Sequence, residues 1–400
     1  MTTTPPPAPA GWYSDPGQSG GWRYWDGTGW TGQTRPVQPN ARVEPTGAGK
    51  RSPLVLLMIV ATVLAVIAAG FVVFRQLSKS THGLHIAKYP VSVAVDPGIQ
   101  AVYVTHSSDG TVSVIDGRTR KLTATVPIGE NPRGVAVDPE SHTVYVTNDN
   151  GVSVIDGSTN RLTATVRIGK GPDGVAVDPG ARTLYVTNRD DGTMSVIDGS
   201  TNTVTATLPV GKDPGGVAVD PGTHTVYVTN YDPGTNQGRV SVVDGSTRAV
   251  VATVPVGAPG DAVTELAVDP GTRTVYVPNR FDGTVWVIDG PTHTVTATVP
   301  VNRPREENSD SDISSEVLGG GPQGVAVDPG SHAIYVSHKG ADNNESMVSK
   351  IDGSTRAVTE SVDVGNNPTA VAVDPGTHTV YTISADSHTG DGTLWAVEFP

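Results

Sequence analysis

Carboxylates and imidazoles are the side chains in this sequence best suited to act as acids, bases or metal ligands, and both recur at regular intervals. An aspartate stands between Val and Pro in seven places, at Asp96, Asp138, Asp178, Asp220, Asp269, Asp328 and Asp374. Histidine follows four of them at an equivalent corner position, at His142, His224, His332 and His378. Aspartate before Pro and Gly forms tight turns. Because every unit carries the aspartate, we interpret these aspartates as turn formers and the corner histidines as structural or exposed.

The candidates for chemistry are therefore the positions at which the units differ. One set begins the first strand of each unit: Val91, Arg133, Asp173, Gly215, Thr264, Gln323 and Thr369. Glu265 adds a carboxylate where most units have Gly. These mixed side chains suit the recognition of a polar ligand or peptide and do not form a matched acid–base pair. We name Arg133, Asp173, Thr264, Glu265, Gln323 and Thr369 as candidate binding residues and predict no catalytic residue.

A second set of candidates is histidine. His106 and His338 stand where other units end their second strand in Asn, and His388 lies in the corresponding loop of the last unit. Three imidazoles on one face would bind a transition metal or sense pH. Their loops differ in length, however, and no acidic side chain is placed beside them. We keep the three histidines as binding candidates and predict neither a metal site nor a cofactor. The acidic stretch 302–320 matches no EF-hand pattern either.

The elements that position these residues are short strands. Residues 134–139, 143–148, 151–157 and 161–169 alternate Val or Ile with small polar residues, as β-strands do, and turn residues separate them. Such groups of four recur at a spacing of about forty residues, which is typical of a β-propeller. We therefore predict an all-β, seven-bladed propeller of four-stranded blades over residues 81–400, with the candidate residues around its central channel.

Three units carry the tetrapeptide that names the YVTN family of propeller repeats, at residues 145–148, 185–188 and 227–230, and residues 276–279, 103–106 and 335–338 are degenerate copies. The chain resembles this family over residues 81–400. The resemblance implies the propeller fold and a binding scaffold. Similar propellers also include lactone hydrolases, antibiotic-ring lyases, quinone-cofactor dehydrogenases and surface-layer proteins, so the fold alone does not fix the activity.

The last unit provides only three strands, at residues 370–374, 379–383 and 393–398. Residues 83–90 align with 207–214, so we expect the first strand to complete the last blade. This 3+1 closure removes the exposed edges of an open ring. The tether, residues 75–80, enters at the start of an outer strand and reaches at most about 20 Å. The Asp-Pro-Gly and Asp-Gly-Ser-Thr turns are therefore expected to face the bilayer, and the opposite face to point away from it.

The region before the repeats divides into three parts. Residues 1–10 are rich in Pro and Thr and are predicted to be disordered. Residues 11–35 hold four of the six tryptophans and resemble a Trp-rich domain of unknown function that is common at the N-terminus of actinobacterial membrane proteins. Stacked tryptophans must supply most of its burial, and membrane-surface or protein docking is the alternative role. Residues 36–52 are predicted to be a linker.

One stretch is predicted to span a membrane. Leu54 to Phe74 is a run of 21 uncharged residues, long enough to cross the hydrocarbon core as a helix. We assign residues 53–74 to a transmembrane signal anchor, since the run is too long for a cleaved signal peptide and starts too far from Met1. Basic residues slightly favour a cytoplasmic N-terminus and an extracytoplasmic propeller. A ridge of Ala61, Ala65 and Ala69 allows homodimerisation through this helix.

Composition excludes several functions. Residues 1–52 carry five Lys/Arg and three Asp/Glu, so the rest of the chain holds 22 basic and 37 acidic residues. An acidic propeller lacks the electrostatic footprint of a nucleic-acid-binding protein. The sequence has no cysteine, which removes thiol chemistry and Cys-ligated metals. It also lacks the Gly-x-Ser-x-Gly, His-Glu-x-x-His and phosphate-loop motifs.

Together these features predict a single-pass membrane protein whose extracytoplasmic propeller binds a protein, a peptide or a cell-envelope glycan on the face away from the membrane. The alternatives are a propeller enzyme of the lactone hydrolase or lyase type and a structural surface-layer component. An enzyme would require charged residues or a metal at the channel mouth. A surface-layer role would require lateral contacts between propellers.

Overall fold

The computed structural model describes residues 11–14, 21–26, 28–36, 81–257, 265–301, 321–339 and 346–399. The chain forms two compact units, Met1–Val73 and Phe74–Pro400. The expected disordered residues 1–10, most of the linker, the membrane helix 53–74, the tether 75–80, the acidic stretch 302–320 and Thr264 lie outside the described residues. Within the described ranges, no helix has the length and apolar character needed to cross a bilayer.

The first unit contains a three-stranded antiparallel sheet in the order β1 (Gly11–Ser14), β2 (Gly21–Trp25) and β3 (Trp30–Pro36). The turn between β2 and β3 is held by Asp26, whose Oδ1 accepts hydrogen bonds from the backbone N–H groups of Thr28 (2.8 Å) and Gly29 (2.7 Å). The rings of Trp25 and Trp30 pack edge to face across the two strands, with centroids 5.3 Å apart. Aromatic contact therefore supplies part of the packing of this small sheet, as its composition predicts.

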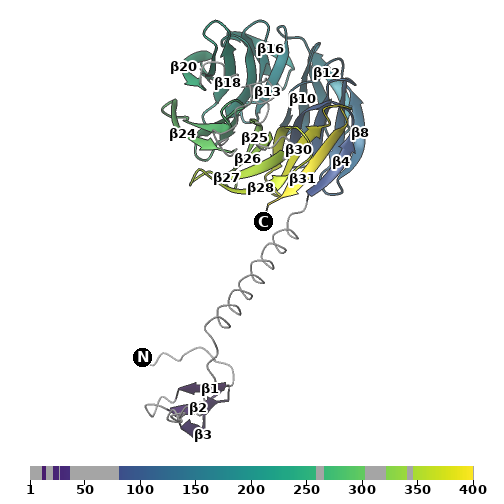
Figure 1. The fold of residues 1–400 in the computed structure, drawn as a ribbon. Coiled ribbons are helices and arrows are strands. Elements are labelled where there is room, and N and C mark those ends of the chain that lie inside the picture. Colours follow the sequence, from purple (N-terminus) through teal and green to yellow (C-terminus); the bar gives the residue numbers. More distant parts are fainter. Residues whose placement is uncertain are drawn as a thin grey trace, which may run out of the picture. The chain divides into compact units, whose positions relative to one another are not determined.

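The second unit is a ring of seven four-stranded antiparallel sheets, so the predicted all-β, seven-bladed propeller is confirmed (Figure 1). Blade 1 contains β5 (Pro90–Asp96), β6 (Ala101–His106), β7 (Thr111–Asp116) and β8 (Lys121–Pro127); blade 2 contains β9 (Val135–Asp138), β10 (Thr143–Asn148), β11 (Gly151–Asp156) and β12 (Arg161–Val166); blade 3 contains β13 (Pro172–Asp178), β14 (Thr183–Asn188), β15 (Thr193–Asp198) and β16 (Thr203–Pro209). Blade 4 contains β17 (Pro214–Asp220), β18 (Thr225–Asp232), β19 (Gln237–Asp244) and β20 (Ala249–Val256); blade 5 contains β21 (Ala267–Asp269), β22 (Thr274–Asn279), β23 (Thr284–Asp289) and β24 (Thr294–Pro300); blade 6 contains β25 (Pro322–Asp328), β26 (Ala333–Lys339), β27 (Ser346–Asp352) and β28 (Ala357–Asp363). Blade 7 contains β29 (Pro368–Asp374), β30 (Thr379–Ala385), β31 (Gly392–Glu398) and β4 (Thr81–Ile86).

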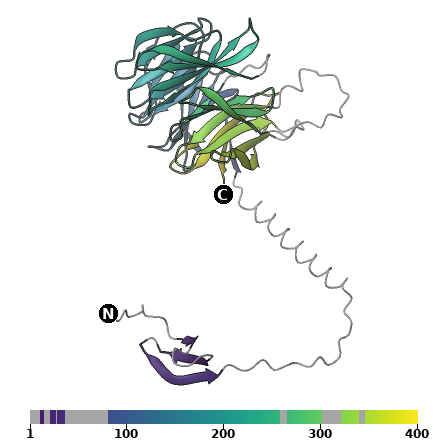
Figure 2. The ribbon, with the colours of Figure 1, turned by 90° about the vertical axis from the view of Figure 1, so that its left-hand side faces the viewer.

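Blade 7 closes the ring in the predicted way. Strand β4, the first of this unit, pairs antiparallel with β31, the last, and Leu84 lies opposite Leu394. The two strands are side by side in both views, although more than three hundred residues separate them (Figure 1, Figure 2). The N-terminal strand therefore serves as the outer strand of the last blade.

The hydrophobic core lies between the blades. Seven clusters of buried side chains each join two neighbouring blades, one cluster at each joint of the ring. At the closing joint, Val104 of blade 1 packs with Ile383 and Leu394 of blade 7. Second and third strands are buried on both faces for this reason, while outer strands expose residues such as Leu122 (49 % exposed). Apolar burial between blades is thus the main force that stacks them.

The repeated Val-Asp-Pro aspartates both form turns and connect blades. Asp178 is fully buried; its Oδ1 accepts the N–H of Ala181 in its own turn, and its Oδ2 lies 2.6 Å from Nδ1 of His224 in the next blade. The same pairing joins His142 to Asp96 (2.9 Å), His332 to Asp269 (2.8 Å) and His378 to Asp328 (2.6 Å). The turn interpretation was therefore incomplete, because the corner histidines also link four of the seven carboxylates to the following blade.

The tyrosine of the tetrapeptide explains why a glycine, and no larger residue, stands in the Asp-Gly turn of the next blade. A Cβ atom added at Gly157 would lie 2.6 Å from the hydroxyl oxygen of Tyr103, which reaches across from the preceding blade. Tyr145, Tyr185, Tyr227 and Tyr381 approach the corresponding glycines Gly199, Gly245, Gly290 and Gly117 in the same way. The glycine leaves room for the neighbouring tyrosine, so these two repeated positions depend on each other.

The side chain of the last residue of the tetrapeptide is buried and bonds to the third strand of its own blade. Asn148 Nδ2 donates a hydrogen bond to Ser153 Oγ of the third strand (2.8 Å), and Asn148 Oδ1 accepts the N–H of Asn150 in the following loop. His106 and His338 take the same place, with Nε2 at 2.9 Å from Ser113 Oγ and 2.7 Å from Ser349 Oγ, respectively. Histidine and asparagine are interchangeable here because each presents a nitrogen to the serine hydroxyl.

Candidate functional site

The two faces of the ring differ in what they carry. The corner face, as we call it, holds the Asp-Pro and Asp-Gly turns that join first to second and third to fourth strands. The mouth face is the opposite one, on which the inner strands β5, β9, β13, β17, β25 and β29 begin. The sequence candidates at the starts of these strands therefore lie at the mouth face.

A cavity of about 330 Å3 occupies the centre of the ring, and every blade contributes to its wall. Its lining is Val91, Ser92, Val93, Arg133, Gly134, Val135, Asp173, Gly174, Val175, Arg189, Gly215, Gly216, Val217, Glu265, Gly324, Val325, Ala370 and Val371. The charged side chains come from blades 2, 3 and 5, while blades 6, 7 and 1 present mainly Val and Ala. The cavity therefore has one charged wall and one apolar wall.

Glycines bring the inner strands close together around this cavity. A Cβ atom added at Gly134 would lie 2.7 Å from the carbonyl oxygen of Asp173, and one at Gly174 would lie 2.6 Å from that of Gly215. Since such distances exclude any side chain, the glycine that begins many inner strands is required by the packing of neighbouring blades.

Threonines of the tetrapeptide fix the backbone of the charged wall. Thr105 Oγ1 donates to the carbonyl of Arg133 in the next blade (2.8 Å), Thr147 Oγ1 to that of Asp173 (2.6 Å), and Thr187 Oγ1 to that of Gly215 (2.7 Å). All three threonines are fully buried. The residues at the cavity are therefore held on rigid backbone by contacts between blades.

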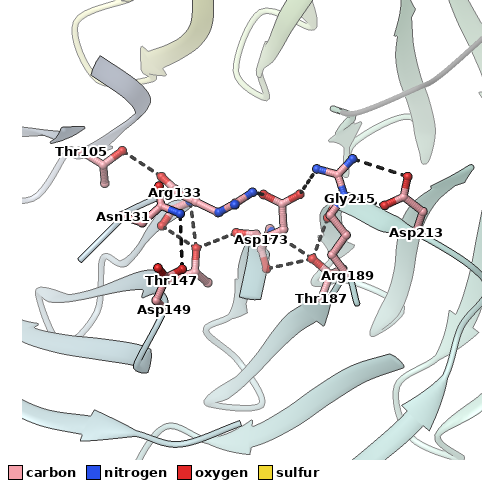
Figure 3. A network of polar contacts seen from close by, with 12 residues as sticks. Thr105, Asn131, Arg133, Thr147, Asp149, Asp173, Thr187, Arg189, Asp213 and Gly215 are labelled. Atoms are coloured by element: carbon pink, nitrogen blue, oxygen red, sulfur yellow. Dashed lines mark hydrogen bonds and ion pairs between the residues drawn. The ribbon is translucent and has the colours of Figure 1, made fainter. Parts of the chain in front are cut away.

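The charged wall is a chain of alternating side chains, which we call the mouth network (Figure 3). Asp173 lies between two arginines, with Oδ1 3.6 Å from Arg133 and Oδ2 3.7 Å from Arg189. Arg189 turns its other side to Asp213, with Nε 2.5 Å from Oδ1. The two contacts of Asp173 are long for an ion pair, so the Asp173 side chain is not saturated by its neighbours.

The electrostatics of the network are set by burial and by its arginines. Burial raises the pKa of Asp173, and the opposing effect of Arg133 and Arg189 does not cancel this rise. The hydrogen bond to Asp213 raises the pKa of Arg189. A partly buried carboxylate and two fixed guanidinium groups are suited to bind a ligand that offers both hydrogen-bond donors and acceptors.

Glu265 is the charged side chain that blade 5 contributes to the cavity wall. Its side chain is exposed to the water of the channel, yet the ring surrounds it on all sides. The surrounding protein raises its pKa to about 7, with a smaller contribution from Asp173. Contact with channel water limits this rise. Glu265 is thus a carboxyl group of the cavity wall whose pKa lies above its ordinary value.

Only some of the predicted binding candidates lie on the cavity wall. The structure brings Arg133, Asp173 and Glu265 together on this wall. Gln323 and Thr369 lie on β25 and β29 at the same face, outside the cavity lining, and Thr264 lies outside the described residues.

The three histidines are not brought together. His106 and His338 are buried within blades 1 and 6, where burial lowers the pKa of each. His388 lies in an exposed loop, with Nδ1 3.1 Å from Ser387 Oγ. Across the described residues, no three His, Asp or Glu side chains gather closely enough to hold a metal ion. His106 and His338 were expected to lie on a common face of the ring, but each side chain points into the interior of its own blade.

Arg189 and Asp213 are the residues of the mouth network that the sequence analysis did not select. Arg189 directly follows Asn188, a position at which other units have Ser107, Asp149, Tyr231, Arg280, Lys339 and Ala385. This variation could have identified Arg189 as a candidate, because the end of the second strand lies beside the start of the inner strand, where the other candidates stand.

Known proteins resemble each of the two units: a family model matches the N-terminal unit, and a solved structure matches the propeller. Residues 10–43 match a family described as a protein of unknown function (DUF2510). No curated protein matches the chain. Among solved structures, hydrazine synthase from Kuenenia stuttgartiensis superposes with a TM-score of 0.65 at 18 % identity, covering 78 % of this chain and 96 % of that chain. At this identity the likeness shows the fold alone: the chain is similar to that protein in having a seven-bladed propeller, and it carries a DUF2510 domain at its N-terminus.

Proposed function

We propose that the chain is a membrane-anchored extracytoplasmic binding protein whose propeller engages a protein, a peptide or a cell-envelope glycan at the mouth face. The observation that carries this proposal is the central cavity, with the mouth network on one side and an apolar wall on the other. Peptides and glycans both combine polar groups with apolar faces, so this wall fits them.

The contrast between repeated and unrepeated residues supports the same function. The repeated Asp, His, Tyr, Thr and Asn side chains are engaged in contacts within or between blades. The unrepeated Asp173 has only long contacts with Arg133 and Arg189, and all three side chains face the cavity. Side chains that the fold does not require are the natural candidates for ligand binding.

The anchor and the repeat type complete the proposal. We assign the 21 uncharged residues from Leu54 to Phe74 to a transmembrane helix with a cytoplasmic N-terminus. We also assign the repeats to the YVTN type on the tetrapeptides at residues 145–148, 185–188 and 227–230. The mouth face would then point away from the membrane.

A capture experiment with the full chain tests the binding function. The tagged protein is expressed in an actinobacterial host, cross-linked in intact cells and recovered, and its envelope ligands are identified by mass spectrometry. The test variant is Arg133→Gln with Asp173→Asn. We expect it to lose most of the ligand recovered with the unaltered chain.

The matched control removes the same charges from the corner face through Arg161→Gln with Glu140→Gln, both of which are exposed. The control variant should recover ligand as the unaltered chain does. Equal recovery by the mouth variant and the control would show that the mouth network is not the binding site.

A propeller enzyme of the lactone hydrolase or lyase type is the second candidate, and Glu265 is the observation that favours it. A carboxyl group with a raised pKa on the wall of a cavity is suited to general acid or base catalysis. Turnover of lactone substrates that is lost in Glu265→Gln, with folding unchanged, would favour the enzyme over the binding protein.

A further inference from the structure

The seam between blade 7 and blade 1 differs from the other joints of the ring on the corner face. At six joints the second oxygen of the Val-Asp-Pro aspartate accepts a hydrogen bond from the histidine of the next blade, from a Ser or Thr three residues later in the chain, or from both. Histidine alone bonds to Asp96 (His142) and Asp178 (His224), and a hydroxyl alone bonds to Asp138 (Ser141) and Asp220 (Thr223). Both kinds of donor bond to Asp269 (Thr272 and His332) and Asp328 (Ser331 and His378).

Asp374, at the seam, lacks this partner. Its Oδ1 accepts the N–H of Gly376 (2.9 Å), while the nearby Thr377 hydroxyl donates to Thr379 instead. Gln100 holds the corner position of blade 1, where four other blades have His, and it makes no side-chain hydrogen bond to Asp374 within the described residues. Asp374 is only 3 % exposed, and within the described residues its second carboxylate oxygen has no protein donor, although the side chain lines a pocket.

The unpartnered carboxylate lines a pocket of about 530 Å3, formed by Gln100, Gly117, Arg118, Arg120, Asp374, Thr377, His378, Thr379, Tyr381, Glu398 and Phe399. Ligand pockets commonly have volumes of about 300–1,000 Å3. The charges of its wall are otherwise matched: Arg120 pairs with Glu398, and His378 pairs with Asp328. Arg118 is exposed at the turn and therefore strongly screened by water.

We propose that this seam pocket binds the guanidinium or ammonium group of an arginine or lysine side chain presented by a partner protein. The cation would supply to Asp374 the charged donor that histidine supplies at four other joints. Phe399, a half-buried ring on the pocket wall, would cover part of its methylene stem. A metal ion fits less well, because no cluster of three His, Asp or Glu exists among the described residues.

This site is independent of the mouth network, since it lies on the opposite face of the ring. The test uses the full chain in detergent and isothermal titration with the peptide N-acetyl-Gly-Arg-Gly-amide, with N-acetyl-Gly-norleucine-Gly-amide as the uncharged control. We expect binding of the arginine peptide and at least a tenfold weaker response to the norleucine peptide. Absence of arginine-peptide binding to the unaltered chain would overturn the proposal.

Two variants identify the pocket. Asp374→Asn keeps the acceptor for Gly376 but removes the charge, and Gln100→His places the imidazole of the other joints beside Asp374; the φ of 53° at Gln100 matches the φ of 55° at His142. Each should weaken arginine-peptide binding at least tenfold, and Gln100→His should also raise the unfolding temperature. Asp138→Asn, at a joint whose carboxylate is bonded by Ser141, is the control and should leave binding unchanged.

The outcomes are separable. Loss of binding in Gln100→His together with greater stability would mean that the imidazole fills the site, as proposed, since a misfolded variant would be less stable. Unchanged binding in Asp374→Asn or in Gln100→His, or an equal loss in Asp138→Asn, would overturn the assignment of the pocket.

Discussion

Gly157→Ala is the substitution that tests the packing between blades most simply. Gly157 is buried in the Asp-Gly turn of blade 2, and an added Cβ would lie 2.5 Å from the carbonyl oxygen of His142 and 2.6 Å from the hydroxyl oxygen of Tyr103. Its φ is not in the left-handed region, so alanine is compatible with the backbone itself. The expected loss of stability therefore comes from contacts rather than from backbone strain.

The size of the effect follows from two opposing terms. Overpacking in a well-packed interior costs about 1–3 kcal/mol, while replacing Gly by Ala stabilises by about 0.4–1 kcal/mol through the unfolded chain. We expect a net loss of about 1–2 kcal/mol in the free energy of unfolding. For a domain of this size, that corresponds to a fall in Tm of roughly 2–6 °C.

The assay is urea unfolding of the full chain, followed by near-ultraviolet circular dichroism, with Gly180→Ala as the matched control. Gly180 is an exposed turn glycine whose added Cβ would meet its nearest atom at 3.7 Å. The control should be neutral or slightly stabilising, since it gains only the unfolded-state term.

A second variant separates the two contacts. The Tyr103 hydroxyl is buried and has no hydrogen-bond partner in the described part of the chain, so Tyr103→Phe should be nearly neutral. In the Gly157→Ala background, Tyr103→Phe removes one of the two clashes and should recover about half of the lost stability. Gly157→Ala and Gly180→Ala of equal stability would refute the packing account of the glycine.

Three further predictions concern charged groups. His224→Asn keeps a residue that tolerates the φ of 55° but leaves buried Asp178 without its partner, so urea unfolding at pH 7 should show a loss of about 1–2 kcal/mol; no loss would mean that the pair is incidental. Although burial raises the pKa of Asp328, its bonds from Ser331, His378 and Gly330 outweigh this and lower it; the resulting stability is present above the unfolded pKa and is lost as pH falls through the folded pKa. Asp328→Asn should therefore flatten the acid limb of the stability curve below about pH 4, and an unchanged limb would contradict the shift. Glu265, whose pKa is raised from 4.5 to about 7, binds its proton more tightly in the folded state, so stability should decline between these pH values; Glu265→Gln should be less affected on going from pH 5 to pH 8, and an identical decline in both proteins would exclude this group.

The architecture was predictable because every unit repeats the same local pattern. Alternation of apolar and polar residues predicted the strands, and the seven Val-Asp-Pro aspartates predicted the number of blades. The alignment of residues 83–90 with 207–214 located the closing strand, which the pairing of Leu84 with Leu394 confirms. The pairing of His224 with Asp178 was not predictable, because the two residues are 46 positions apart and meet only when blades stack.

The candidate site was predictable in part for the same reason. Arg133 and Asp173 were found because they begin inner strands, and those strands line the cavity. Arg189 was missed because it reaches the cavity from the end of a second strand, through the conformation of a long side chain. His106 and His338 were grouped with His388 by position in the repeat, but alignment does not reveal that their imidazoles turn inward to Ser113 and Ser349.

Site-specific cross-linking tests most directly whether the ligand binds at the mouth of the channel. Since the sequence has no cysteine, a single Val91→Cys on the cavity wall can carry a photoreactive group, and Leu162→Cys on an outer strand can carry the same group as a control; both positions are at least one-third exposed. In intact cells, we expect a covalent envelope adduct from position 91 and none from position 162. Adducts in equal yield from both positions, or from position 162 alone, would contradict the proposed binding function.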